Sequence, residues 1–306
     1  MTVIRKFYHN CYQHICQKSA DNGMIFLSVM DYIVLITTIC IKAAKNNVQI
    51  LAICIMLNHF HIEALFGNEL IMTRFMNGVT SVVARAYNKH YHLCGQLFKR
   101  PFKNSPKYTE SRKKDNFIYI SNNPVVKKAV QKAEDYKWNL IKYIDSPNPY
   151  SEPFNPSTAS TNLIELMKKV KELHENGKPV GYVILRKNLF KLSQKEQDQL
   201  VDFIISTYYT VDKEALIKMY GSYDNMLAAL HAVSGSEYDI SDDTSEEDYK
   251  HYSQMIRIAN EEGYDVNRMR FDKNTMKDEN YYRMIKRFSY EAKASEYEIQ
   301  KFLHTL

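Results

Sequence analysis

The chain has 306 residues, of which 45% are hydrophobic and 25% charged, a composition typical of a soluble globular protein with room for two domains. Its five cysteines are odd in number and show no CxxC spacing, which argues against a disulfide framework and favours reduced thiols in a cytoplasm. The net charge of +6 is divided unevenly, because residues 1–150 carry 20 Lys and Arg against 9 Asp and Glu, whereas residues 151–306 carry 21 against 26. The N-terminal half is therefore the half expected to meet a polyanion.

The start of the chain predicts a strand followed by a helix. Residues 1–20 alternate weakly between polar and apolar types, and residues 28–46 have the apolar content of a buried helix. The segment 24–41 is the one membrane candidate, but Asp31 at its middle would cost about 2.5–3.5 kcal/mol on insertion. We therefore expect a helix packed on a sheet, no membrane contact and, in the absence of a signal-peptide pattern, no secretion.

A continuous apolar run over residues 48–65 predicts one strand that is buried on both faces. Within it, His59 and His61 should project from the same face about 7 Å apart, while Phe60 points into a core. Two adjacent imidazoles can hold one divalent metal ion, although packing or chance also produces this pattern. Glu63 shares their facing by parity and is a candidate further ligand or base, with a surface or core-edge role favoured.

Apolar residues at helical spacing over 72–87 predict a long helix with one apolar face. A second His-x-His, His90 and His92, lies at its end, and we interpret it as structural. The segment 96–103, QLFKRPFK, is predicted to be a strand or hairpin that contacts phosphates and bases, with a solvated strand as the alternative. Its candidate DNA-binding residues are Lys99, Arg100 and Lys103.

Tyr119 and Asn123 stand four residues apart, so that on a helix both lie on one face about one turn apart. Asn123 could then complete a metal site with His59 and His61, while Tyr119 faces the same ion. Pro124 should end this turn or begin the next helix.

Residues 113–132 are predicted as a helix, a proline break and a second helix, with lysines on both sides of Tyr119. A phosphate backbone brought to the tyrosine would meet positive charge there, although a solvated lysine-rich face is the alternative. The lysines are Lys113, Lys114, Lys127, Lys128 and Lys132.

Residues 145–162 contain four of the eight prolines together with Ser, Thr and Asn, which is typical of a linker. We therefore predict two domains, residues 1–147 and residues 148–306. The second should be mainly helical, with amphipathic helices over 162–176 and 212–232 and with Ser193 as the cap of another.

The stretch 237–248 carries seven acidic residues and no basic one, and is predicted to be an exposed connector. Residues 283–304 look like a helix-turn-helix whose second helix has Ser295 as its N-cap. DNA reading by this helix is one interpretation, and a scaffold bundle is the other.

Four motifs occur in a fixed order: MLNHFH at 56–61, YNK with GQLFKRPFK at 87–103, YISNNP at 119–124 and DYKW at 135–138. This arrangement resembles the single-tyrosine transposases of the HUH endonuclease superfamily, which are IS200-like, and most closely their REP-associated branch. The resemblance covers about residues 5–145. Four positions depart from the family pattern, namely Leu57, Ile118, Ser121 and Asn122, where proline, arginine, histidine and leucine are usual.

The resemblance implies an α+β fold of ferredoxin-like type, an antiparallel sheet with packed helices, for residues 1–147. It implies Tyr119 as a nucleophile that forms a 5′-phosphotyrosine linkage with single-stranded or hairpin DNA. It also implies Mg²⁺ or Mn²⁺ held by His59, His61 and Asn123. A monomer or homodimer in the cytoplasm, at the nucleoid, is the expected setting.

Two other interpretations stay open from the sequence. A domesticated, catalytically silent protein would keep the fold in order to recognise DNA hairpins or repeats. A structural zinc module would use His59 and His61, but few thiolate or imidazole ligands lie nearby in the sequence to complete a four-ligand site.

Overall fold

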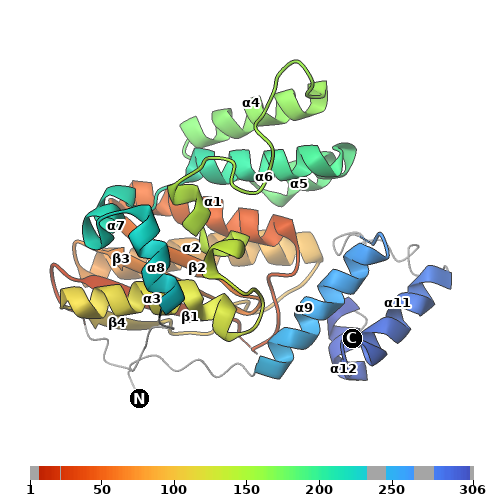
Figure 1. Cartoon of the computed structure of the whole chain (residues 1–306), viewed down its shortest axis with the longest axis horizontal. Coiled ribbons are helices and arrows are strands. Elements are labelled where there is room, and N and C mark those ends of the chain that lie inside the picture. Colours follow the sequence, from red (N-terminus) through yellow and green to blue (C-terminus); the bar gives the residue numbers. More distant parts are fainter. Residues whose placement is uncertain (1–6, 21, 233–245, 265–278, 304–306) are drawn as a thin grey trace.

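A computed structural model describes residues 7–20, 22–232, 246–264 and 279–303 (Figure 1). Four strands form one antiparallel sheet in the order β2-β3-β1-β4, the strand order of a ferredoxin-like βαββαβ unit. The predicted α+β fold is confirmed. The first elements are β1 (Tyr12–Lys18), α1 (Val29–Asn46), β2 (Gln49–Ile55), β3 (His59–Leu65), α2 (Glu69–Tyr91), β4 (Lys103–Lys107) and α3 (Glu110–Val126).

The two faces of the sheet carry different side chains. Phe60 and Ile62 of β3 enter an apolar core with α1 and α2. His61, between them, points to the opposite face, where α3 packs against β2 and β3. Among the described residues, no helix is long and apolar enough to cross a membrane.

The prediction of one strand over 48–65 is wrong, because this segment is a hairpin. The chain turns between β2 and β3, where the Met56 N–H donates to the His59 carbonyl at 2.8 Å. Both strands are almost entirely buried, so the apolar run continues through the turn without a glycine or proline to mark it. His59 therefore begins β3 instead of lying within a longer strand.

The predicted helix, proline break and second helix over 113–132 is also wrong. The helix α3 continues through Pro124 and ends at Val126. Pro124 lies in the last turn, where its missing N–H removes only one backbone bond. Beyond it the chain leaves the helix through Lys128, whose φ of 58° is left-handed, and no second α-helix forms before residue 132.

The carboxylate of Asp31 ties α1 to two other helices. Asp31 is fully buried, and its Oδ2 accepts the Ser28 N–H in a capping box that begins α1. Its Oδ1 accepts the hydroxyls of Tyr91, at the end of α2, and Tyr182, on α5 (Tyr182–Asn188), each at 2.8 Å.

Asp31→Ala is expected to lower the free energy of unfolding by about 2–6 kcal/mol, because it leaves two buried tyrosine hydroxyls without their acceptor. Urea unfolding followed by circular dichroism measures this. Asp135→Ala is the control, since its carboxylate is exposed and pairs with Lys142 at the surface, so a change within about 1 kcal/mol is expected. Equal effects of the two substitutions would contradict the account of Asp31.

The C-terminal part is helical, as predicted. Ser193 caps α6 through a capping box with Glu196. Helices α5 and α6 pack on α1 and extend the core on the face of the sheet that α1 and α2 cover (Figure 1). The helices are α4 (Thr161–Glu175), α5, α6 (Gln194–Tyr208), α7 (Lys213–Tyr220), α8 (Tyr223–Ala232), α9 (Glu246–Glu261), α11 (Glu279–Tyr290) and α12 (Glu296–Leu303), with 3-10 turns at Ala133–Asp135, Lys137–Asn139, Ile141–Ile144 and Leu189–Lys191.

The last helices pack as a small group, α9 on α11 and α11 on α12. Ser295 caps α12 as predicted, because its Oγ accepts the Glu298 N–H and its N–H donates to the Glu298 carboxylate. A role of α11 and α12 in DNA reading stays a prediction, as does the domain division at 147/148. The acidic connector predicted over 237–248 falls outside the described residues up to 245, and its last residues belong to α9.

Candidate active site

His59 and His61 lie side by side at the start of β3, as their spacing predicted. Their ring centroids are 4.8 Å apart and their planes are nearly perpendicular. His59 Nδ1 lies 2.6 Å from the side-chain oxygen of Asn58, whose amide nitrogen donates to the Asn22 carbonyl. Because that oxygen only accepts, Nδ1 carries the proton and the lone pair of His59 is on Nε2.

The helix α3 brings Tyr119 and Asn123 over this pair. Thr109 caps the helix by accepting the Arg112 N–H. The Tyr119 ring lies 6.0 Å from that of His61, and the amide nitrogen of Asn123 is 3.4 Å from His61 Nε2. One site thus brings together the side chains of His59, His61, Tyr119 and Asn123. The first and the last of these residues are 64 positions apart in the chain.

The site includes buried polar atoms of the kinds that bind a divalent cation. Asn123 is 4% exposed, and its Oδ1 has no hydrogen-bond partner among the described residues. Amide oxygen suits Mg²⁺ and Mn²⁺, whereas imidazole nitrogen binds first-row transition metals, of which Mn²⁺ is one. No three His, Cys, Asp or Glu side chains of the described ranges cluster as a metal site, so oxygens of Asn123, of water or of a substrate would complete the shell.

His14 is a site residue that sequence reasoning missed. It lies on β1, and its Nε2 is 2.9 Å from Nδ1 of His61. Its ring also lies 5.9 Å from the Tyr119 ring. His14 therefore orients His61 so that Nε2, the other ring nitrogen, faces Asn123. Weak alternation in residues 1–20 placed His14 on a strand, but nothing in one sequence told which strand pairs with β3.

His14→Ala is expected to weaken metal binding by about 10–100-fold, the usual effect of removing a group that orients a metal-bound histidine. Titration of Mn²⁺ into the purified protein, followed by calorimetry, measures this. His9→Ala is the control, because His9 is exposed and lies outside β1. A Kd unchanged by His14→Ala would contradict the orienting role.

Glu63 has no exposed surface, so of the surface or core-edge role favoured from the sequence the surface part is wrong. It is opposite His14 in the sheet and shares the face of the histidines. Burial is the largest cause that raises the pKa of Tyr12 to about 12, and the negative charges of Asp212 and Glu63 add to it. Tyr12 therefore keeps its proton at neutral pH.

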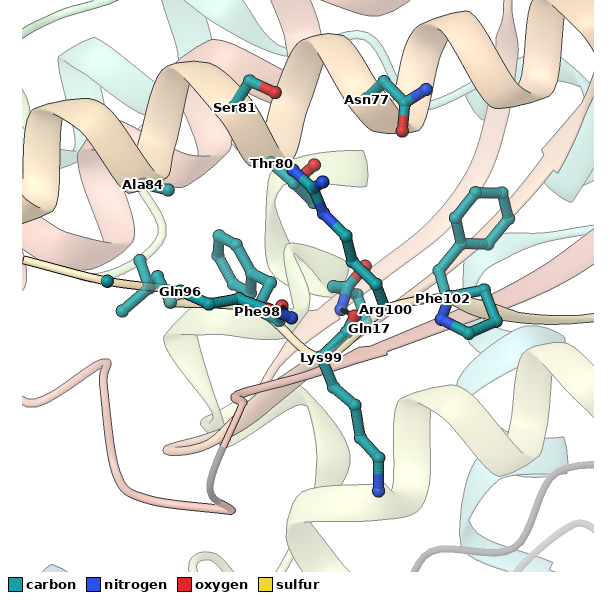
Figure 2. Close-up of a pocket in the computed structure, with 13 residues that line it drawn as sticks. Gln17, Asn77, Thr80, Ser81, Ala84, Gln96, Phe98, Lys99, Arg100 and Phe102 are labelled. Atoms are coloured by element: carbon teal, nitrogen blue, oxygen red, sulfur yellow. Dashed lines mark hydrogen bonds between the residues drawn. The ribbon is translucent and has the colours of Figure 1, made fainter.

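The segment 96–103 is not the predicted strand or hairpin, because it runs as a loop with one bridge, Ser19 to Phe98, until β4 begins at Lys103. The loop forms one wall of a cavity of about 650 Å³ whose other wall is the Asn77–Ala84 face of α2. Figure 2 shows Arg100 extending toward α2 and Lys99 extending away from it. Both side chains are exposed, as is Lys103.

The predicted lysines in α3 and just after it lie in different surroundings. Lys113 pairs with Glu110 at 2.8 Å, and Lys114 lies over the ring of Tyr220. Lys127 is only 8% exposed and follows Asn123 by one turn, its N–H donating to the Asn123 carbonyl. Lys128 is exposed. These positions do not form one continuous solvated face.

The family model described as "Transposase IS200 like" matches residues 7–120. No curated protein matches the chain. A solved structure, "Structure of the REP associates tyrosine transposase bound to a REP hairpin", aligns with 53% of this chain and 96% of its own, at 14% identity and a TM-score of 0.42. The family match supports a role in DNA transposition. The part of the chain that holds His59, His61 and Tyr119 thus matches the IS200-like transposases, the family that its motifs resemble.

Proposed function

We propose that this protein is a metal-dependent single-stranded DNA endonuclease and transposase that cleaves and rejoins DNA through a 5′-phosphotyrosine at Tyr119. The observation that carries this proposal is the packing of α3, with Tyr119 and Asn123 directed at His61. A tyrosine beside two imidazoles and an amide provides a nucleophile together with ligands for a cation. The chain would act as a monomer or homodimer in the cytoplasm, on DNA at the nucleoid.

In the cleavage step the Tyr119 hydroxyl loses its proton and its oxygen attacks the scissile phosphorus. The bond from phosphorus to the 3′ oxygen breaks, and that oxygen takes up a proton to leave a free 3′-OH. One phosphoester replaces another, so the 3′-OH of a second strand can reverse the step without ATP.

The ordinary pKa of tyrosine, near 10, makes it a weak nucleophile at neutral pH, so the phosphate must be activated. His59, His61 and Asn123 would hold Mg²⁺ or Mn²⁺, which supplies Lewis-acid polarisation of the phosphate when bound. Asn58 holds His59 in the tautomer that keeps its Nε2 lone pair available. A proton on His61 Nδ1, donated to His14 Nε2, would do the same for His61.

We propose that Lys99, Arg100 and Lys103, together with Lys113, Lys114, Lys127 and Lys128, contact the DNA. Lys99→Ala and Arg100→Ala are each expected to weaken binding of a hairpin oligonucleotide and to lower the slope of log K against log salt by about one. Fluorescence anisotropy at several salt concentrations measures this. Lys169→Ala, an exposed lysine of α4, is the control, and an unchanged slope in both loop variants would remove these residues from the interface.

The proposal is tested with labelled single-stranded oligonucleotides that carry hairpins, incubated with the protein and Mn²⁺, Mg²⁺ or EDTA. A covalent protein–DNA band that needs the metal and survives a denaturing gel is the expected result. DNA from the native flanks of the gene is included as substrate. Binding without any adduct on these substrates would favour the silent DNA-binding protein instead.

A further inference from the structure

The segment 209–232, which lies outside the family match, packs against α3 (Figure 1). It starts at the edge of the sheet, where Val211 pairs in parallel with Ile50 and the Asp212 N–H donates to the Ile50 carbonyl at 2.7 Å. Asp212 then caps α7 by accepting the Ala215 N–H. The start of this segment is therefore fixed to β2, the strand that turns directly into β3, where His59 and His61 lie.

One contact of the segment is with the first half of α3. The hydroxyl of Tyr220 donates to the Lys114 carbonyl at 3.2 Å. Its ring lies 5.7 Å from that of Phe117, and the Lys114 ammonium lies over the ring. Tyr220 thus contacts α3 on the N-terminal side of Tyr119.

The second contact is with the last half of α3. The amide nitrogen of Asn122 donates to the Leu230 carbonyl at 2.8 Å, and both residues are buried. Leu230 lies in the last turn of α8, where carbonyls lack a helical partner, so Asn122 supplies the donor that this helix end needs. Asn122 is also one of the positions at which this chain departs from the family pattern.

The two contacts flank Tyr119, and apolar residues fill the space between them. Leu216 and Met226 have no exposed surface, and Leu230 is 3% exposed. Asn122 and Asn123 are adjacent, so on a helix they point about 100° apart. Asn122 can therefore hold α3 from its side while Asn123 and Tyr119 keep facing His61.

We infer that residues 209–232 form a clamp that fixes α3, and with it Tyr119, in the catalytic position over the histidines of the same chain, with Asn122 and Tyr220 as its positioning residues. This inference rests on the proposed function for its kinetic consequence. A nucleophile that is displaced by about 1 Å can lose about a hundredfold in rate, so the clamp acts on the rate of attack and not on DNA affinity.

The test compares Asn122→Asp with Asn188→Asp in the full chain. Both asparagines donate to a backbone carbonyl at 2.8 Å, but Asn188 bonds to Ile184 within α5, far along the chain from α3. Asn122→Asp is expected to slow adduct formation about 10- to 100-fold with an unchanged Kd for the oligonucleotide, whereas Asn188→Asp leaves both unchanged. Should Asn122→Asp fail to fold, Tyr220→Phe removes the hydroxyl that donates to the Lys114 carbonyl and is measured in its place.

Hydrogen exchange provides an arm that needs no cleavage. The amides of residues 113–126 are expected to exchange faster in Asn122→Asp than in the unaltered protein, with no change in Asn188→Asp. Unchanged exchange overturns the clamp whether or not the protein cleaves DNA. Faster exchange with an unchanged rate of adduct formation overturns its positioning role. Absence of any adduct in the unaltered protein would instead refute the proposed function, and exchange alone would then decide whether the clamp holds α3.

Discussion

Tyr119→Phe is expected to abolish the covalent protein–DNA adduct while leaving the affinity for the oligonucleotide unchanged. The substitution removes only the hydroxyl oxygen, and the ring keeps its packing near His14 and His61. Removing the nucleophile of a catalytic constellation costs about 10⁴-fold or more in rate, which places the product below detection on a gel. Quantification of adduct and of bound DNA in the same samples measures both effects.

Tyr108→Phe is the matched control for this substitution. Tyr108 directly precedes the cap of α3 and is 57% exposed, so the loss of its hydroxyl should leave cleavage unchanged. An adduct that persists in Tyr119→Phe would show that another residue attacks the phosphate.

His61→Ala is expected to slow adduct formation by about 10²–10³-fold, because polarisation of the phosphate by a metal is worth several kcal/mol and each 1.36 kcal/mol is tenfold in rate. His61 contacts both His14 and Asn123, so its loss removes one proposed ligand of the metal and a partner of each of these two neighbours. Raising the Mn²⁺ concentration should recover part of the rate. A metal titration of the cleavage rate measures the loss and the recovery.

The second His-x-His provides the control for His61. His92 is exposed and ends α2 with a left-handed φ of 55°, a conformation that asparagine tolerates. His92→Asn should therefore cleave DNA at the unaltered rate. A similar loss in both variants would indicate general damage to the fold, and no loss in His61→Ala would refute its role as a ligand.

Periodicity was sufficient to predict the central part of the site. Alternation in a strand placed His59 and His61 on one face and Phe60 on the other, and helical spacing placed Tyr119 and Asn123 together. These relations depend on residues close in the chain, so one sequence contains them. The resemblance to a known family added the pairing of the two segments, which local patterns do not give.

The errors arose where long-range packing decides the structure. The turn at Met56–Asn58 contains no glycine or proline that would mark it in the sequence. Both flanking strands are buried, so the apolar pattern continues across the turn. The role of His14 depends on the pairing of β1 with β3, and the buried state of Glu63 on the packing of α3. The contact from Asn122 to Leu230 joins residues 108 apart, and no local signal marks it.

The most direct test of the account is to locate the DNA on the protein. The adduct formed with Mn²⁺ is digested with a protease and a nuclease, and mass spectrometry identifies the peptide that carries the remaining nucleotide. A 5′-phosphate linked to Tyr119 within the α3 peptide is the expected result. A nucleotide on any other residue, or one attached through a 3′-phosphate, would contradict it.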